Sequence, residues 1–134
     1  MKVLSGIDAV HIPRISAQLG KRGTAFIDKC YTEGEKEYAL SHKAEGRRAE
    51  IFAGRFAAKE AVAKALGTGI MAEGIAMTDI EITADAKGAP LLTLHGKAQE
   101  KAQELRVTSS SVSITHEKDY AAAICVLLTD EEVR

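Results

Sequence analysis

The feature that most constrains the fold is a long helical pattern in the middle of the chain, at residues 46–66. At about 100° per residue, one side of this pattern is apolar, which is typical of a helix face turned toward the core. That side holds Phe52, Phe56, Ala63 and Leu66. Gly67 marks the expected end, because glycine commonly follows the last helical turn. We therefore expect a long central helix.

A second stripe on this helix combines small residues with charge, and holds Ala53, Ala57, Glu60 and Lys64. The small side chains allow another backbone to come close to the two charged ones. Gly54 lies inside the helix, where glycine costs about 1 kcal/mol relative to alanine. It therefore predicts either tight packing or a place where another group approaches the backbone.

The segments on either side alternate between helical and strand patterns. Pro13 suits a first helical turn, and Thr32 with Glu35 has the form of a capping box, which predicts a helix start. The letters DAKGA between two apolar runs are typical of a hairpin loop. We expect helices or helical turns at about 13–19, 24–31, 32–42 and 96–105, and strands at 2–7, 79–84, 90–95, 109–115 and 120–128.

The length of 134 residues fits one domain over residues 1–134, and the mixture of elements predicts the α+β class. Alanine contributes 22 residues and tryptophan none, so the core is expected to be thin. A thin core in a short chain favours an oligomer, because contact between subunits supplies further burial.

Charge and cysteine content narrow the function classes. The net charge of −1 and the few aromatic residues argue against a general nucleic-acid binder. No apolar run approaches the roughly 18–20 residues that span a bilayer, and the first residues do not resemble a signal peptide. Cys30 and Cys125 belong to no CxxC pair. We expect a cytoplasmic protein with reduced thiols, no membrane contact and no nucleic-acid partner.

Asp8, Glu60 and Lys64 form the first candidate site. A carboxylate at a strand end and another on a helix can converge on Mg²⁺, which prefers oxygen ligands, and a lysine one turn later can neutralise phosphate charge. The alternative is structural: Asp8 as a helix cap, and Glu60 with Lys64 as a surface pair worth about 0.3–0.5 kcal/mol. Spacing alone does not decide between the two.

Three further groups are weaker candidates. The residues Gly67, Thr68 and Gly69 could cradle a phosphate, or could simply end the helix. His116, after an expected strand, could contact phosphate, or could be exposed in a turn. Basic residues suit an acidic partner or a phosphorylated ligand, although a solvated face is the default for each of them; they are Arg14, Lys21, Arg22, Arg47, Arg48 and Arg55.

Five strings of the sequence are familiar in their order and spacing: GIDAVHIPRI at 6–15, FAGRFAAKEAVAKALGTGI at 52–70, DIEI at 79–82, KGAP at 87–90 and SVSITHEKDYAAAICV at 111–126. With these strings, the chain resembles the holo-[acyl-carrier-protein] synthases, the short phosphopantetheinyl transferases. The strings follow the family's order and spacing over nearly the whole chain.

The resemblance implies a fold and an activity. The fold is a small antiparallel sheet packed against a long central helix and shorter helices. The activity is Mg²⁺-dependent transfer of 4′-phosphopantetheine from coenzyme A to a serine of apo acyl carrier protein, with release of adenosine 3′,5′-bisphosphate, in fatty acid biosynthesis. Family members are homotrimers with active sites at subunit interfaces.

The resemblance also implies residue roles. Asp8 and Glu60 correspond to metal ligands and, with Lys64, to the catalytic residues. The residues expected to bind coenzyme A are Arg55, Lys64, Gly67, Thr68, Lys87, Gly88, Pro90 and His116. The basic face that receives the acidic carrier protein corresponds to Arg14, Lys21 and Arg22. Ala89 departs from the family pattern, because many relatives carry lysine there.

Some alternatives stay open at this point. The proton of the carrier serine could pass to Glu60 directly, to a metal-bound water held by Glu60, or to another bound water; a metal-bound carboxylate is a weak base, which favours water. A rival to the enzyme is a binding module that holds coenzyme A or the carrier protein without turnover. The complete set of Asp8, Glu60, Lys64 and His116 favours the enzyme.

Overall fold

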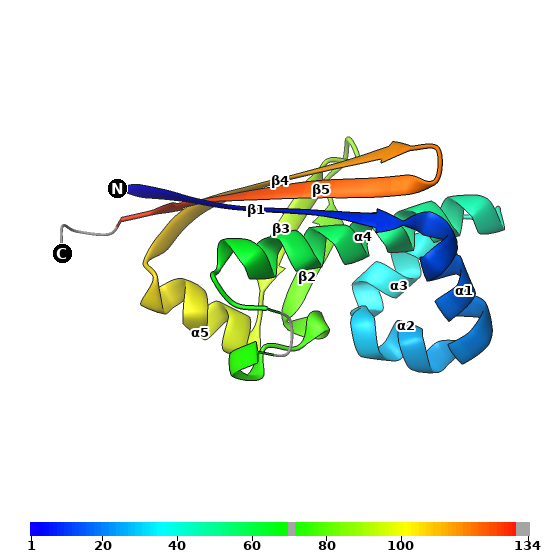
Figure 1. Ribbon diagram of the computed structural model, residues 1–134, viewed down its shortest axis with the longest axis horizontal. Coiled ribbons are helices and arrows are strands. Elements are labelled where there is room, and N and C mark those ends of the chain that lie inside the picture. The colour runs from blue at the N-terminus through cyan, green and yellow to red at the C-terminus, as the bar shows by residue number, and fades with distance from the viewer. Residues whose placement is uncertain (70–71, 131–134) are drawn as a thin grey trace.

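The long central helix α4 (Glu45–Ala65) lies along one face of a three-stranded antiparallel sheet (Figure 1). The computed structural model describes residues 1–69 and 72–130. The sheet consists of β1 (Lys2–His11), β5 (Tyr120–Thr129) and β4 (Val107–Glu117), in that order. A separate hairpin is formed by β2 (Ile80–Ala84) and β3 (Pro90–Leu94).

Shorter helices cover the ends of this arrangement. Figure 1 shows α1 to α3 gathered at one end of the sheet and α5 at the other. Their bounds are α1 (Ile12–Arg22), α2 (Thr24–Cys30), α3 (Glu33–Leu40) and α5 (Gly96–Glu104), and 3₁₀ turns span Ala72–Gly74 and Met77–Asp79. Among the described residues, no helix is long and apolar enough to cross a membrane.

Glycine allows β1 to lie directly on α4. A Cβ built on Gly6 would stand 2.0 Å from the carbonyl oxygen of Ala61 and 2.7 Å from the amide nitrogen of Ala65. Both contacts are with helix backbone, which cannot move aside as a flexible side chain could. The prediction that another backbone comes close to the charged stripe is confirmed at Lys64, whose Cβ would lie 2.9 Å from a Cβ on Gly6, and it is β1 that approaches. The small residues at this contact are Ala61 and Ala65, which lie outside the predicted stripe.

Gly54 on α4 serves the same purpose for β4. A Cβ at this position would come within 2.9 Å of the Ile114 Cγ2 atom and 3.1 Å of the His116 Nε2 atom. The expectation of tight packing at Gly54 is therefore confirmed.

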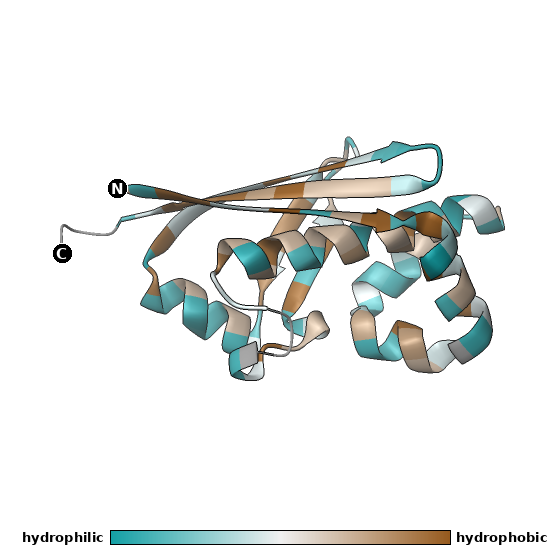
Figure 2. Ribbon diagram, viewed as in Figure 1, coloured by the Kyte–Doolittle hydropathy of each residue, from teal (hydrophilic) through white to brown (hydrophobic). Residues whose placement is uncertain are grey.

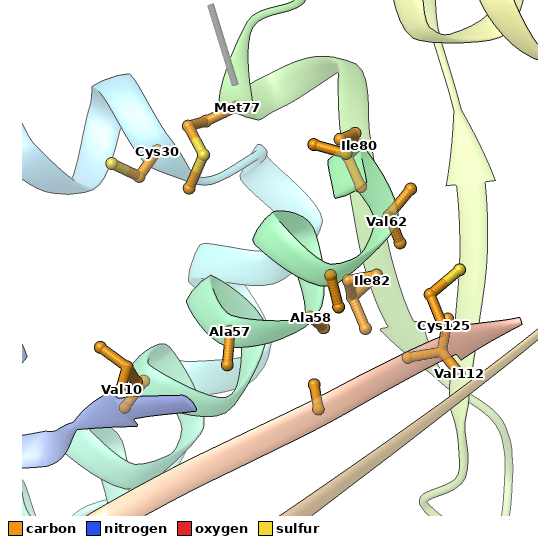
Figure 3. Packing of buried hydrophobic residues seen from close by; sticks show 14 of the residues in the cluster. Val10, Cys30, Ala57, Ala58, Val62, Met77, Ile80, Ile82, Val112 and Cys125 are labelled. Atoms are coloured by element: carbon orange, nitrogen blue, oxygen red, sulfur yellow. The ribbon is translucent and has the colours of Figure 1, made fainter. Parts of the chain in front are cut away.

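The core lies on both sides of α4. Figure 3 shows Ala57 facing the strand that carries Val10, while Ala58 and Val62 lie toward Ile82 and Ile80 of the hairpin. The predicted core stripe is confirmed at Phe52, Ala63 and Leu66, all at most 2% exposed, whereas Phe56 is half-buried. Figure 2 shows apolar residues recurring along α4 and mostly hydrophilic ones along α5.

Several elements run longer than the sequence predicts. The strand expected at 2–7 continues to His11, because β1 keeps its antiparallel pairing with β5 as far as His11 opposite Tyr120. The strand expected at 109–115 likewise continues to Glu117. The helix expected at 13–19 spans Ile12–Arg22, with proline in its first turn as predicted. The capping box of Thr32 and Glu35 is confirmed at the start of α3.

The two cysteines are buried and form no disulfide. Burial raises the pKa of the Cys125 thiol to about 11. The thiolate is the reactive form of cysteine, so Cys125 packs as a small apolar residue at neutral pH.

Candidate functional site

The candidate site forms where the last turns of α4 cross β1. Asp8 lies inside β1, with its side chain 20% exposed, and the Lys64 ammonium reaches it from α4. The Lys64 Nζ donates to Asp8 Oδ1 at 3.2 Å and to the carbonyl oxygen of Ile7 at 2.9 Å. Gly6 shortens the distance between Lys64 and Asp8, because its lack of a side chain allows β1 to pack directly on α4 at Lys64.

Glu60 lies one turn before Lys64 and is half-buried. Burial raises the pKa of the Glu60 carboxyl, and the negative charge of Asp8 raises it further, while Lys64 and Arg14 act in the opposite direction. The negative charges of Asp8 and Glu60 thus repel each other across this site, and the positive charges of Lys64 and Arg14 act against that repulsion.

This donor set fits a divalent cation. Mg²⁺ is commonly held by one or two protein carboxylates together with waters and substrate phosphates. A cation between Asp8 and Glu60 would relieve their repulsion. Among the described residues, no cluster of three or more His, Cys, Asp or Glu side chains could hold a metal, so the remaining ligands of such a cation would be water or phosphate oxygens.

The structural alternatives for these residues do not match the geometry. Asp8 does not cap α1, since that helix begins at Ile12, and its N-cap residue His11 makes no side-chain capping bond. The ion pair of Lys64 is with Asp8, and within the described part of the chain none joins Lys64 to Glu60. The three side chains instead converge between two elements.

The glycine turn after α4 ends the helix. The Gly67 amide donates to the Lys64 carbonyl at 3.0 Å and the Thr68 amide to the Ala63 carbonyl at 3.1 Å, which is the Schellman arrangement. Gly67 has a φ of 83°, which glycine adopts without strain. These two amides are therefore already used, and the Thr68 hydroxyl is left as a buried oxygen without a partner.

Arg55 lies on α4 nearer its N-terminus than Glu60, and His116 lies on β4 against the same part of the helix. Arg55 is 9% exposed, stacks on the Tyr38 ring at 4.8 Å, and has an Nη2 atom without a partner. Burial lowers the pKa of its guanidinium. His116 is half-buried in β4, and its Nε2 donates to the Glu50 carbonyl at 3.0 Å. The alternative of an exposed turn residue is therefore wrong.

The residues Lys87, Gly88 and Pro90 belong to the tip of the β2–β3 hairpin. Asp85 shapes this turn, because its Oδ1 accepts hydrogen bonds from the Lys87 and Ala89 amides at 2.8 and 2.9 Å. Lys87 and Gly88 are exposed. Within the described residues, no hydrogen bond or ion pair joins this tip to Arg55 or His116.

The predicted basic face lies on α1. Arg14 and Lys21 are exposed, and α1 contains no acidic residue; the side chain of Arg22 lies outside the described residues. Arg14 also lowers the pKa of Glu60. The basic face therefore begins beside the two carboxylates.

A buried ion pair next to the site was not predicted from the sequence. The Lys59 Nζ lies 2.7 Å from Glu35 Oε1, and both side chains are at most 1% exposed. Burial lowers the pKa of Lys59, while Glu35 acts in the opposite direction. The sequence does indicate that Lys59 is unusual, because this charged residue interrupts the apolar stripe of α4 between Phe56 and Ala63.

Comparison with known proteins identifies the family of this fold and site. The sequence model of the 4′-phosphopantetheinyl transferase superfamily matches residues 5–125. A holo-[acyl-carrier-protein] synthase from Carboxydothermus hydrogenoformans is 47% identical over 94% of this chain and 98% of its own length. One from Gloeobacter violaceus is 44% identical over 88% of this chain and 86% of its own length.

Solved structures agree with this result. The Chronobacterium ammoniagenes ACPS–CoA complex superposes with a TM-score of 0.85 at 34% identity, covering 98% of this chain and all of the other. The Helicobacter pylori holo-[acyl-carrier-protein] synthase in complex with coenzyme A gives 0.80 at 32% identity, over 93% of this chain and all of the other. The chain therefore belongs to the 4′-phosphopantetheinyl transferase superfamily and, within it, to the holo-[acyl-carrier-protein] synthases, a family of enzymes.

Proposed function

We propose that this protein transfers 4′-phosphopantetheine from coenzyme A to a serine of apo acyl carrier protein, with Mg²⁺ as its cofactor, in fatty acid biosynthesis in the cytoplasm. The observation that carries the proposal is the convergence of Asp8, Glu60 and Lys64 beside the basic face of α1. That arrangement provides oxygen donors for a cation, a cation for a phosphate, and a docking face for an acidic protein.

In the reaction, the serine oxygen of the carrier forms a bond to the phosphorus that bears the pantetheine arm. The bond from this phosphorus to adenosine 3′,5′-bisphosphate breaks, and the bisphosphate leaves with the electron pair. Asp8 and Glu60 would hold Mg²⁺, which when bound supplies charge neutralisation to the pyrophosphate. The serine proton goes to a water molecule rather than directly to Glu60.

Lys64 stabilises negative charge on the phosphates as the leaving group departs. Its present partners, Asp8 and the Ile7 carbonyl, hold the ammonium at the site before substrate arrives. The chain's task is mainly alignment and neutralisation, since phosphoryl-type transfer needs little covalent chemistry from the protein.

The nucleotide end of coenzyme A is assigned to residues with unused polar atoms. The Arg55 Nη2 and the Thr68 hydroxyl are buried without hydrogen-bond partners. Burying such polar atoms costs free energy unless a ligand provides the missing hydrogen bonds. Lys87 and Gly88 are exposed at the hairpin tip, and Pro90 is half-buried at the start of β3. The His116 ring lies against α4 at Glu50 and Gly54. Because both amides of the Gly67 turn are occupied, that turn offers the Thr68 hydroxyl rather than a backbone cradle.

We also propose a homotrimer with active sites at subunit interfaces. The face of the three-stranded sheet opposite α4 exposes apolar side chains, namely Val3 at 62%, Ile7 at 65%, Ile124 at 41% and Tyr120 at 56%. A second copy would cover this face and would bring the separated parts of the site together. Sedimentation velocity tests it: the wild type is expected to be a trimer and Ile7→Glu a monomer, and a monomeric wild type would contradict it.

The test of the function is the intact mass of apo acyl carrier protein after incubation with coenzyme A, Mg²⁺ and this protein. We expect a gain of one phosphopantetheine, and none with EDTA or with Asp8→Asn. Asp28→Asn is the matched control, because Asp28 also pairs with a lysine, at 2.9 Å, but on α2; it should retain the gain. Tight coenzyme A binding without any gain would favour a binding module instead.

A further inference from the structure

The buried ion pair of Glu35 and Lys59 connects three elements of the fold. Glu35 Oε1 accepts from the Thr32 amide at 2.8 Å and pairs with the Lys59 Nζ at 2.7 Å. Glu35 Oε2 accepts from the Ile82 amide at 2.7 Å. Glu35 thus joins the start of α3 to α4 and to strand β2.

Lys59 makes the corresponding bonds from the side of α4. Its Nζ donates to the Met77 carbonyl at 3.0 Å and to the Ile80 carbonyl. With Glu35, these acceptors use the three N–H groups of the ammonium. The first strand of the β2–β3 hairpin is therefore tied to the pair at two points, Ile80 and Ile82.

Stability alone is a poor account of such a pair. Apolar residues of similar volume commonly replace a buried ion pair with no loss of stability, or with a gain. What the pair supplies, and an apolar contact does not, is a set of directed bonds that fixes how β2 lies on α4.

The ion pair of Glu35 and Lys59 lies between the proposed phosphate-binding residues of α4 and the β2–β3 hairpin. Lys59 is adjacent to Glu60 and lies one turn after Arg55, so it is on the helix that carries the phosphate-binding residues. The hairpin that it holds ends in the turn of Lys87 and Gly88. Misplacement by about 1 Å far from the reacting atoms can cost about a hundredfold in rate.

We propose that Glu35 and Lys59 are positioning residues that fix the nucleotide-binding hairpin relative to α4. The inference rests on the proposed function, and it holds whether the hairpin serves the site of its own subunit or that of a neighbour. The pair acts through Lys87 and Gly88, and does not itself touch coenzyme A.

The test is the affinity for adenosine 3′,5′-bisphosphate, measured by calorimetry on the full-length protein. The variant is the double change Glu35→Leu with Lys59→Met, which keeps the volume and removes the directed bonds. We expect its Kd to rise at least about tenfold, with the KM for the carrier protein unchanged. Ile51→Val, also buried on α4, is the control and should stay within about twofold.

A Kd for the double variant within about twofold of wild type would overturn the inference. If the double variant does not fold, Glu35→Gln replaces it, because one amide cannot accept from both Lys59 and Ile82 as the carboxylate does; the same fold-change is expected. Wild-type protein that binds neither the bisphosphate nor coenzyme A would overturn the proposed function itself. That result differs from equal binding by the wild type and the double variant, which would overturn only the positioning role.

Discussion

Lys59 and Glu60 are neighbours on α4, but each belongs to a different cluster of lysine and carboxylate side chains, and the two clusters differ in burial and in hydrogen bonding. Lys59 is completely buried, and its ammonium is matched by Glu35 and two carbonyls. Glu60 is half-buried, and its carboxylate faces the like charge of Asp8. Glu35 and Lys59 form a closed cluster that is buried. Asp8, Glu60 and Lys64 form an open cluster that is partly exposed to solvent.

The difference indicates which cluster can do chemistry. A buried pair whose bonds are all made has nothing left to offer a ligand. A pair of carboxylates held in repulsion gains from a cation, and a half-exposed lysine beside them can exchange its protein partner for a phosphate. The proximity of a lysine and a carboxylate is thus less informative than the partners that each still lacks.

The largest expected effect is on stability, at the closed cluster. Lys59→Ala leaves the Glu35 charge buried without its partner, and should lower the free energy of unfolding by about 3–5 kcal/mol. Lys64→Ala removes an exposed partner and should change it by at most about 1 kcal/mol. Urea denaturation measures both, and equal losses would contradict the distinction between the clusters.

The second effect is on activity, at the open cluster. Lys64→Ala should reduce the rate of phosphopantetheine transfer by about 10²–10³-fold, the usual cost of losing one group that stabilises transition-state charge. Lys36→Ala, which removes an ion pair with Asp28 and Glu33, is the matched control and should keep the wild-type rate. A time course of carrier modification distinguishes them, and an active Lys64→Ala would remove that residue from the mechanism.

The third effect concerns the contact that builds the open cluster. Gly6→Ala places a methyl group against the backbone of α4 and should destabilise the protein by about 1–3 kcal/mol. Gly20→Ala in α1, where a Cβ meets nothing within 4 Å, should stabilise it by about 0.4–1 kcal/mol. If β1 lies on α4 as described, the melting temperature should fall in Gly6→Ala and rise in Gly20→Ala. A melting temperature that does not fall in Gly6→Ala would contradict that packing.

The smallest effect is the pH dependence of a third carboxylate. A hydrogen bond from Thr32 and then one from His95 lower the pKa of Glu81. The stabilisation from Glu81 is therefore present above its ordinary pKa and is lost as the pH falls through the lowered value. Glu81→Gln should melt slightly below wild type near pH 7, by the small margin of a partly exposed pair. The gap in melting temperature should narrow as the pH falls through the lowered pKa of Glu81, and a gap that stays constant into acid would contradict this.

Local signals in the sequence pointed to part of the candidate site, whereas the roles of its residues came from the resemblance to the family. The small residues of α4 predict a close neighbour, and Asp8, Glu60 and Lys64 differ in kind from the residues around them. The Gly67 stop and the Thr32 capping box likewise depend on residues a few positions apart. Such patterns report the period and ends of one element, whatever packs against it.

Features that depend on distant partners were not predicted. Lys59 breaks the apolar stripe of α4, but the sequence does not reveal that Glu35 meets it, because tertiary packing alone brings them together. The extension of β1 past Asp8 depends on pairing with β5 at the far end of the chain. For the same reason His116 was expected in a turn, although it lies in β4 against the α4 backbone.

The most direct test of the central claim is carrier modification by Glu60→Gln, measured as the intact mass of apo acyl carrier protein with coenzyme A and Mg²⁺. The account predicts a folded protein that adds no phosphopantetheine, because the amide no longer offers a charged ligand beside Asp8. Wild-type rates of Mg²⁺-dependent transfer by Glu60→Gln would contradict it, and the open cluster would then not be the active site.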